Sequence, residues 1–110
     1  MVNNESAMEI SEQEFQEIIE NSYKLVVVDF FAEWCMPCLM LSPVIEELAD
    51  RIEDVKFVKI NVDENKNLAE RYNVSSVPTL IVFKEGKEIA RINGNIPGNE
   101  IEEKIKSYLD

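Results

Sequence analysis

The chain is poor in the residues that hold most metal ions. Its 110 residues include no histidine and only two cysteines, Cys35 and Cys38. A structural zinc site takes four Cys or His ligands, so these two thiols could supply half of one. We therefore expect no metal unless a second chain completes the site, and the thiols are left for other chemistry.

Basic residues are scarce as well. The chain has 11 Lys and Arg against 22 Asp and Glu, which gives a net charge of −11. Nucleic acids and anionic membrane surfaces attract basic proteins and repel acidic ones. We therefore expect neither as a partner.

Long apolar runs are missing too. No stretch approaches the roughly 20 residues of a membrane-spanning helix. Residues 1–7 are mostly polar and lack the basic leader and apolar stretch of a secretory signal. These absences predict a cytoplasmic protein, where cysteines stay reduced unless they cycle, so a catalytic or metal role is favoured over a structural bridge.

The length suits one domain. About 110 residues bury enough apolar surface to fold without a disulfide or metal staple. No repeat, low-complexity tract or linker divides the chain. We expect a mobile N-terminal arm at residues 1–7 and a single domain over residues 8–110.

The two cysteines stand three positions apart, directly after the apolar run 25–31. At that spacing on a helix the Cβ atoms lie about 5–6 Å apart, whereas a disulfide needs about 3.5–4.5 Å. A slightly tightened first turn would let the bond form and break. The spacing favours a redox pair, with inert buried thiols or a metal site shared between subunits as the alternatives.

Hydrophobic periodicity predicts alternating strands and helices in the order β-α-β-α-β-α-β-β-α. Such alternation, ending in a hairpin, is typical of an α/β fold whose mixed sheet has parallel central strands and helices on both faces. The expected strands are 8–10, 25–31, 55–62, 77–83 and 88–92, and the expected helices are 11–22, 35–52, 65–72 and a last one from residue 98.

Local signals refine this layout. Ser11 and Glu14 have the spacing of a capping box, and residues 84–87 form the turn of a hairpin. Leu39 is placed on the apolar face of helix 35–52, in which Pro43 should cause a kink. Asn99 is the expected cap of the last helix.

Asp29 interrupts the apolar run 25–31. It shares a face of that strand with Val27 and Phe31, and both faces should be covered by helices. Burial of the carboxylate would raise its pKa and let it exchange protons near neutral pH. The alternative is a carboxylate at a strand end that reaches solvent.

Several segments carry a common pattern, namely residues 28–38, Pro43, residues 59–63, residues 77–80 and Gly94. They span almost the whole chain, and together they resemble the thioredoxin family. The resemblance implies the thioredoxin fold and a protein disulfide reductase that works by dithiol–disulfide exchange. It implies a reversible disulfide between Cys35 and Cys38, no bound cofactor, disulfide-containing proteins as substrates and a separate electron donor of the thioredoxin-reductase type.

The resemblance also assigns roles at the redox site. Cys35, at a helix N-terminus that lowers the pKa of a thiol, is the expected nucleophile. Cys38, one turn inside the helix, should be more buried and act as the resolving thiol. Asp29 is implied as the base that deprotonates Cys38, and Pro37 stiffens the loop.

Lys59 and Pro78 carry further implied roles. The resemblance places Lys59 near Asp29, whose proton affinity it would tune. The alternative is a lysine that only places a charge at a sheet edge. It also implies a cis Val77–Pro78 bond, as opposed to an ordinary proline that starts a strand. Its backbone would then pair with an extended substrate segment. The expected substrate-binding residues are Trp34, Met36, Pro37, Val77, Pro78, Thr79, Gly94 and Asn95.

Three positions depart from the common family pattern. Met36, Leu39 and Phe31 stand where glycine, lysine and tryptophan are usual. They put the redox potential and the partner set in question, but not the reaction type. We interpret the chain as a monomeric reductase, with a disulfide oxidase or isomerase and a non-catalytic docking subunit as the alternatives.

Overall fold

The computed structural model describes residues 7–109, and its elements follow the predicted order. The elements are β1 (Met8–Glu9), α1 (Glu12–Asn21), β2 (Leu25–Phe31), α2 (Met36–Arg51), β3 (Val55–Asn61), α3 (Lys66–Arg71), β4 (Thr79–Lys84), β5 (Lys87–Asn93) and α4 (Gly98–Lys106).

The strands form one mixed sheet in the order β1-β3-β2-β4-β5. Strands β1 and β2 both pair with β3 in parallel, whereas β4 runs antiparallel to β2 and to β5. The predicted α/β class, with parallel strands at the centre and a terminal hairpin, is confirmed. In the turn of that hairpin, Glu85 and Gly86 both have positive φ, as a tight two-residue hairpin turn requires.

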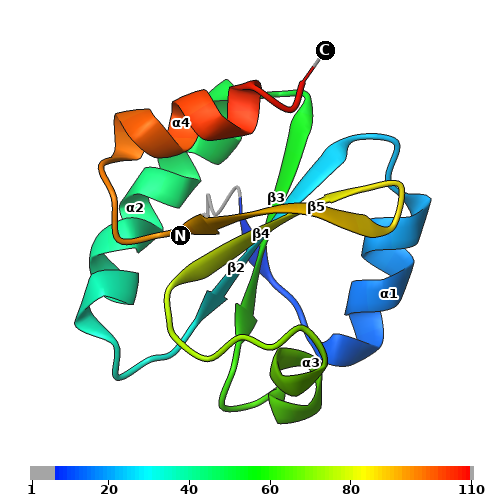
Figure 1. The fold of residues 1–110 in the computed structure, drawn as a ribbon, viewed down its shortest axis with the longest axis vertical. Coiled ribbons are helices and arrows are strands. Elements are labelled where there is room, and N and C mark those ends of the chain that lie inside the picture. Colours follow the sequence, from blue (N-terminus) through cyan, green and yellow to red (C-terminus); the bar gives the residue numbers. More distant parts are fainter. Residues whose placement is uncertain (1–6, 110) are drawn as a thin grey trace, which may run out of the picture.

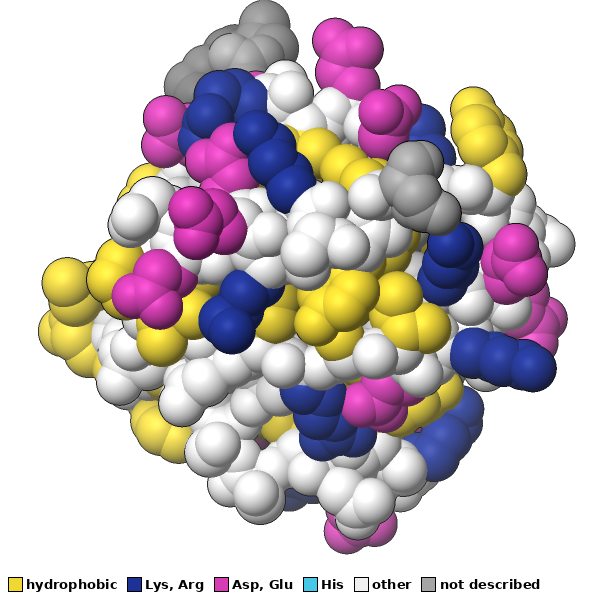
Figure 2. Space-filling view, turned by 45° about the horizontal axis from the view of Figure 1, so that its top comes forward, with side chains coloured by type: hydrophobic (Ala, Val, Ile, Leu, Met, Phe, Trp, Pro, Cys, Tyr) yellow, Lys and Arg dark blue, Asp and Glu magenta, His cyan; other side chains and the backbone are white. Residues whose placement is uncertain are grey.

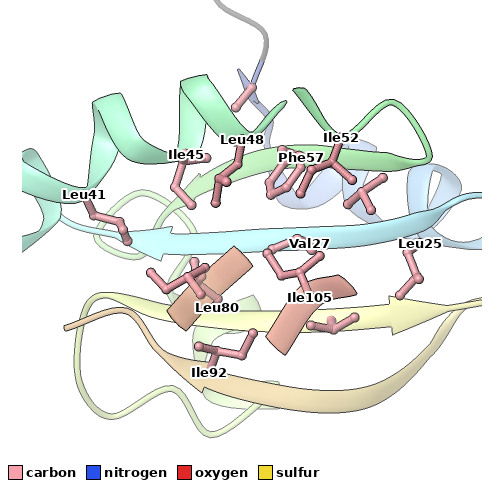
Figure 3. Packing of buried hydrophobic residues seen from close by; sticks show 14 residues of the cluster. Leu25, Val27, Leu41, Ile45, Leu48, Ile52, Phe57, Leu80, Ile92 and Ile105 are labelled. Carbon is pink, nitrogen blue, oxygen red and sulfur yellow. The ribbon is translucent and has the colours of Figure 1, made fainter. Parts of the chain in front are cut away.

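Helices cover both faces of the sheet (Figure 1). Helices α2 and α4 lie over one face, where a buried cluster includes Val27, Ile45 and Ile101. Helices α1 and α3 lie over the other, where the cluster includes Phe15 and Leu68. Figure 3 shows side chains of α2, among them Ile45, directed toward β2.

Strand β2 lies at the centre of this arrangement. Its residues alternate between the two clusters, with Val26, Val28 and Phe30 on the α1 and α3 side. Val27 lies on the α2 and α4 side. Asp29 therefore shares the face of Val27, as the alternation predicted, and α2 covers that face.

Helix α1 begins as its sequence predicted. The backbone N–H of Ser11 donates to the Glu14 carboxylate at 3.0 Å, which is the reciprocal half of a capping box. The Ser11 hydroxyl also donates to Glu14. One orphan donor at the start of the helix is thus satisfied.

Other local predictions were wrong. The cap of α4 is Pro97, and Asn99 lies inside the first turn of the helix. Leu39 is 56% exposed, because it lies on the outer side of α2. Of the arm predicted at residues 1–7, residues 1–6 lie outside the described residues. Its last residue, Ala7, is fully buried, and its N–H donates to Glu46 at 3.2 Å.

Candidate active site

The two cysteines lie at the amino end of α2, joined by a disulfide. Cys35 caps the helix, and its sulfur accepts the backbone N–H of Cys38 at 3.2 Å. Pro37 occupies the first turn, where its missing N–H removes no helical hydrogen bond. The end of β2 and the start of α2 thus bring both thiols together at a positive helix terminus.

Burial does not distinguish the two cysteines in this disulfide state. Cys35 is 4% exposed and Cys38 is 3% exposed. The expectation that Cys38 would be the more buried stays a prediction for the reduced protein, because in the disulfide both sulfurs pack in one small cluster. Ala32 belongs to that cluster, and Phe31, Val62 and Val77 pack against it.

The peptide bond between Val77 and Pro78 is cis. The carbonyl oxygen of Val77 lies 3.8 Å from the Cys35 sulfur, so the loop before β4 directly adjoins the disulfide. The Thr79 hydroxyl donates to the carbonyl of Ser76 at 2.7 Å and closes this turn. The structure thus places the backbone of Val77 beside the reacting sulfur.

Gly94 packs against the buried side of this loop. Its N–H donates to the Pro78 carbonyl at 3.2 Å, and it is buried. A Cβ at this position would come within 2.9 Å of both Pro78 and Leu41. Gly94 therefore supports Pro78 from inside, and its neighbour Asn95 is the exposed member of the pair.

Asp29 is buried on the face of β2 that α2 covers, at 2% exposure. On that face it stands between Val27, which packs in the α2 cluster, and Phe31, which packs against the cysteines. Its Oδ1 atom has no hydrogen-bond partner among the described residues. Burial raises the pKa of Asp29 from 3.8 to about 7, against the opposing charge of Lys59.

Lys59 is the direct neighbour of Asp29 across the β2–β3 ladder. Its ammonium, however, pairs with Glu46 of α2 at 3.2 Å and forms no ion pair with Asp29. The Lys59 side chain is only 13% exposed, which does not fit a charge that merely caps a sheet edge. Lys59 thus acts on Asp29 through space while it is ion-paired with Glu46.

The family model for thioredoxin matches residues 6–107. The chain belongs to the thioredoxin family. A thioredoxin of Chlorobaculum thiosulfatiphilum is 45% identical over 102 residues, which are 92% of this chain and 94% of that protein. A thioredoxin of Chlamydia pneumoniae is 54% identical over 85 residues, covering 77% of this chain and 81% of its own.

Solved thioredoxin structures agree with the fold. An N21Q mutant thioredoxin from Halobacterium salinarum NRC-1 superposes with a TM-score of 0.87 at 33% identity, covering 100% of this chain and 97% of its own. Mitochondrial thioredoxin 3 of Saccharomyces cerevisiae, in its oxidized form, reaches 0.84 at 33% identity and covers 94% of this chain and 97% of its own. As a thioredoxin-family protein with a redox-active cysteine pair, the chain is a thiol–disulfide oxidoreductase that acts by dithiol–disulfide exchange.

Around the thioredoxin-type disulfide lies an exposed apolar patch. We define it as Trp34 (73% exposed), Met36 (64%), Leu39 (56%) and Met40 (70%). The last three lie on one side of α2 because they are spaced by three and four residues. Met40 was not among the predicted binding residues, because a helix with apolar residues on more than one side does not reveal which of them faces the core.

Asp63 is a further residue that the sequence did not single out. Its carboxylate accepts the Trp34 indole N–H at 2.8 Å, and its own N–H donates to the Asn61 side chain. Asp63 follows β3, whose carboxyl end lies beside that of β2. It therefore fixes the orientation of an exposed tryptophan at the edge of the disulfide.

Within residues 7–109, no group of three or more His, Cys, Asp or Glu side chains could hold a metal ion. Thioredoxins need no cofactor for disulfide exchange. In the same part of the chain, no helix is both long and apolar enough to cross a bilayer.

Proposed function

We propose that the protein reduces disulfides in other proteins through Cys35 and Cys38 and is then re-reduced by a separate reductase. The observation that carries this proposal is the cysteine pair at the amino end of α2, with the Cys35 sulfur 3.8 Å from the Val77 carbonyl of a cis Val77–Pro78 bond. Membership of the thioredoxin family supports it.

The first step is attack by the Cys35 thiolate on a substrate disulfide. A new bond forms between Cys35 and one substrate sulfur, and the other substrate sulfur leaves as a thiolate. The amino end of α2 favours the thiolate form of Cys35. The N–H groups of the first helical turn have no helical acceptor, and that of Cys38 donates to the Cys35 sulfur.

Cys38 completes the exchange. Its thiol gives a proton to Asp29, and the resulting thiolate attacks the Cys35 sulfur. The substrate leaves as its second thiolate, and the Cys35–Cys38 disulfide of the present structure remains. The substrate disulfide has gained two electrons, which the two cysteines have lost.

Asp29 suits the role of base because burial raises its pKa to about 7. A base with that pKa is half ionised near neutral pH and can both take up and return the proton. Its position between Val27 and Phe31, on the face toward α2, supports proton exchange with Cys38. Lys59 lowers the pKa of Asp29 through its charge and thereby tunes the base.

Substrate docking is assigned to the surface around the disulfide. The backbone at Val77 and Pro78 would pair with an extended substrate segment, with Thr79 and Asn95 at its margins. Trp34, Met36 and Pro37 would contact the segment on the α2 side, and Gly94 would support the cis bond from inside. Exposed apolar side chains beside a reactive group suit a protein-docking surface.

Partners and location follow from the same proposal. The substrates are disulfide-containing proteins, and the donor is a reductase of the thioredoxin-reductase type. We place the protein in the cytoplasm, where the thiol pool favours reduction, as a single-domain monomer over residues 8–110. Nucleic acid and membrane are not proposed as partners, because the net charge is −11. On the face in Figure 2, Lys and Arg side chains stand in small groups among acidic ones.

A turnover assay with a protein disulfide substrate tests the proposal. The protein should reduce the substrate in the presence of a dithiol donor, and Cys35→Ser should abolish turnover. If the protein were instead a docking subunit without catalysis, Cys35→Ser would leave its effect on a partner protein unchanged.

The reduction potential separates a reductase from an oxidase. Thioredoxin itself has a potential of about −270 mV, and a strongly oxidising relative has one of about −120 mV. Equilibration with a glutathione buffer should give a value near the first. A value near the second would assign the chain to disulfide formation.

A further inference from the structure

Glu46 links helix α2 to the start of the described chain at Ala7 and to strand β3 at Lys59. It lies on α2, two turns beyond Cys38, and its side chain is half-buried. One carboxylate oxygen accepts the backbone N–H of Ala7 at 3.2 Å. The other lies 3.2 Å from the ammonium of Lys59.

The sheet register makes Lys59, the ion-pair partner of Glu46, a cross-strand neighbour of Asp29 as well. Lys59 and Asp29 are direct partners in the parallel β2–β3 ladder, and both lie on the side covered by α2. The other cross-strand partner of Asp29 is Leu80 of β4, which is apolar. Within residues 7–109, Lys59 of β3 acts on Asp29 through its charge, and Glu46 of α2 pairs with that lysine. The cluster of Cys35 and Cys38 packs against Phe31, two residues along β2 from Asp29.

Lys59 bonds to only one of these carboxylates. It forms its ion pair with Glu46, whereas the Oδ1 atom of Asp29 has no hydrogen-bond partner within residues 7–109. An ammonium that turned from Glu46 to Asp29 would meet a carboxylate almost excluded from water, where charges interact strongly. The ion pair with Glu46 opposes that movement.

We propose that Glu46 is a positioning residue, which holds the Lys59 ammonium away from Asp29 and so keeps Asp29 able to take the proton of Cys38. The inference rests on the proposed function, in which Asp29 is the base of the resolving step. Without the Glu46 charge, Lys59 pairs with Asp29 and stabilises its ionised form, which makes Asp29 a weaker base.

The substitution Glu46→Gln removes the charge but keeps an oxygen that can accept the Ala7 N–H. It separates the electrostatic role from a purely structural link between α2 and the start of β1. Lys59→Met removes the ammonium and keeps most of the side-chain volume. Glu47→Gln, at the exposed neighbouring position on α2, is the matched control.

The experiment measures two quantities in the full chain. NMR of the reduced protein follows the titration of the Asp29 carboxyl carbon. Stopped-flow mixing follows resolution of a mixed disulfide between Cys35 and a small aromatic thiol as a function of pH.

We expect Glu46→Gln to lower the titration midpoint of Asp29 and to slow resolution at high pH by about threefold or more, as expected for a weaker base. Lys59→Met should raise the midpoint. Adding Glu46→Gln to Lys59→Met should change it little, because Glu46 acts through the lysine. Glu47→Gln should match the unchanged protein.

Two results would overturn the inference. An unchanged Asp29 midpoint in Glu46→Gln would leave Glu46 as a structural anchor only. An equal change with and without Lys59 would mean that Glu46 acts on Asp29 directly.

The proposed function is tested separately by Asp29→Asn. If that variant resolves the mixed disulfide at the normal rate, Asp29 is not the base, yet the NMR midpoints still report whether Glu46 controls Lys59. If Asp29→Asn slows resolution and Glu46→Gln leaves the midpoint unchanged, the function stands and this inference fails.

Discussion

The two faces of β2 differ in the polarity of the side chains that they bury. Toward α1 and α3, the strand presents only apolar side chains, and the cluster there includes the rings of Phe15, Tyr72 and Phe83 in edge-to-face contact at 5.4 or 5.5 Å between centroids. Toward α2, the same strand carries Asp29, buried and without a hydrogen bond to its Oδ1 atom among the described residues. The first face stabilises the fold, whereas burial of the Asp29 carboxylate on the second face costs stability.

This difference accounts for the raised pKa of Asp29. A carboxylate with a pKa near 7 needs surroundings that exclude water, and the sheet and α2 provide them. The apolar face offsets the cost of that burial. Substitutions on the two faces should therefore change stability in opposite directions.

The largest effect is expected on the apolar face. Phe83→Ala removes a fully buried ring and its two edge-to-face contacts. It should lower the free energy of unfolding by about 3–5 kcal/mol, as measured by urea denaturation. Tyr23→Ala, at a 94% exposed aromatic residue, is the control and should cost less than about 0.5 kcal/mol. Equal losses of unfolding free energy in the two variants would contradict the conclusion that the face toward α1 and α3 stabilises the fold.

The opposite sign is expected at Asp29. The folded pKa of about 7 lies above the ordinary aspartate value of 3.8, so between these pH values the folded protein keeps a proton that the unfolded chain has lost. Native stability therefore falls, relative to Asp29→Asn, by about 1.4 kcal/mol per pH unit over this range. The variant should be more stable by up to about 4 kcal/mol at pH 8 and by little near pH 4.

Denaturant unfolding at a series of pH values checks this prediction. Asp54→Asn, at an exposed carboxylate, is the control and should show no comparable trend. A stability difference for Asp29→Asn that is constant from pH 4 to pH 8 would show that Asp29 does not titrate near neutrality.

A smaller loss is expected at Gly94, which supports the active-site loop. Gly94→Ala would place a Cβ 2.9 Å from both Pro78 and Leu41. Crowding of this kind should cost about 1–3 kcal/mol in unfolding free energy. It should also raise KM for protein substrates, because the loop that would pair with them moves. A rise in KM without any loss of stability would mean that the loop adapts at no cost.

The smallest effect on stability is expected in the apolar patch. Met36→Gly removes an exposed side chain, so the unfolding free energy should change by less than about 1 kcal/mol. The ratio of kcat/KM values across a panel of disulfide substrates should change more, by about threefold to tenfold. Ile89→Ser, at an exposed apolar residue of β5, is the control. Unchanged kcat/KM ratios in Met36→Gly would remove Met36 from the docking surface.

The fold could be predicted from the sequence because its signals are local or periodic. The apolar run of β2 is interrupted only by Asp29, and alternation alone placed this residue on the same face as Val27 and Phe31. The capping contact of Ser11 and Glu14 and the tight turn at Gly86 likewise depend on nearby residues.

The rest could not be predicted because it depends on contacts between distant segments. The Glu46–Lys59 ion pair and the Trp34–Asp63 hydrogen bond join elements whose side-chain positions no local pattern contains. Leu39 was misplaced because α2 is apolar on more than one side. The candidate site residues were named mainly through the family resemblance, and the structure added the ion pair between Glu46 and Lys59.

The most direct test of the account is covalent trapping of a protein substrate. Cys38→Ser should leave the mixed disulfide unresolved, so that mass spectrometry finds the substrate bound to Cys35. Cys35→Ser should trap none, because the nucleophile is missing. Equal adducts on Cys38 in Cys35→Ser, or no adduct in either variant, would contradict the assignment of Cys35 as the attacking thiol and Cys38 as the resolving one.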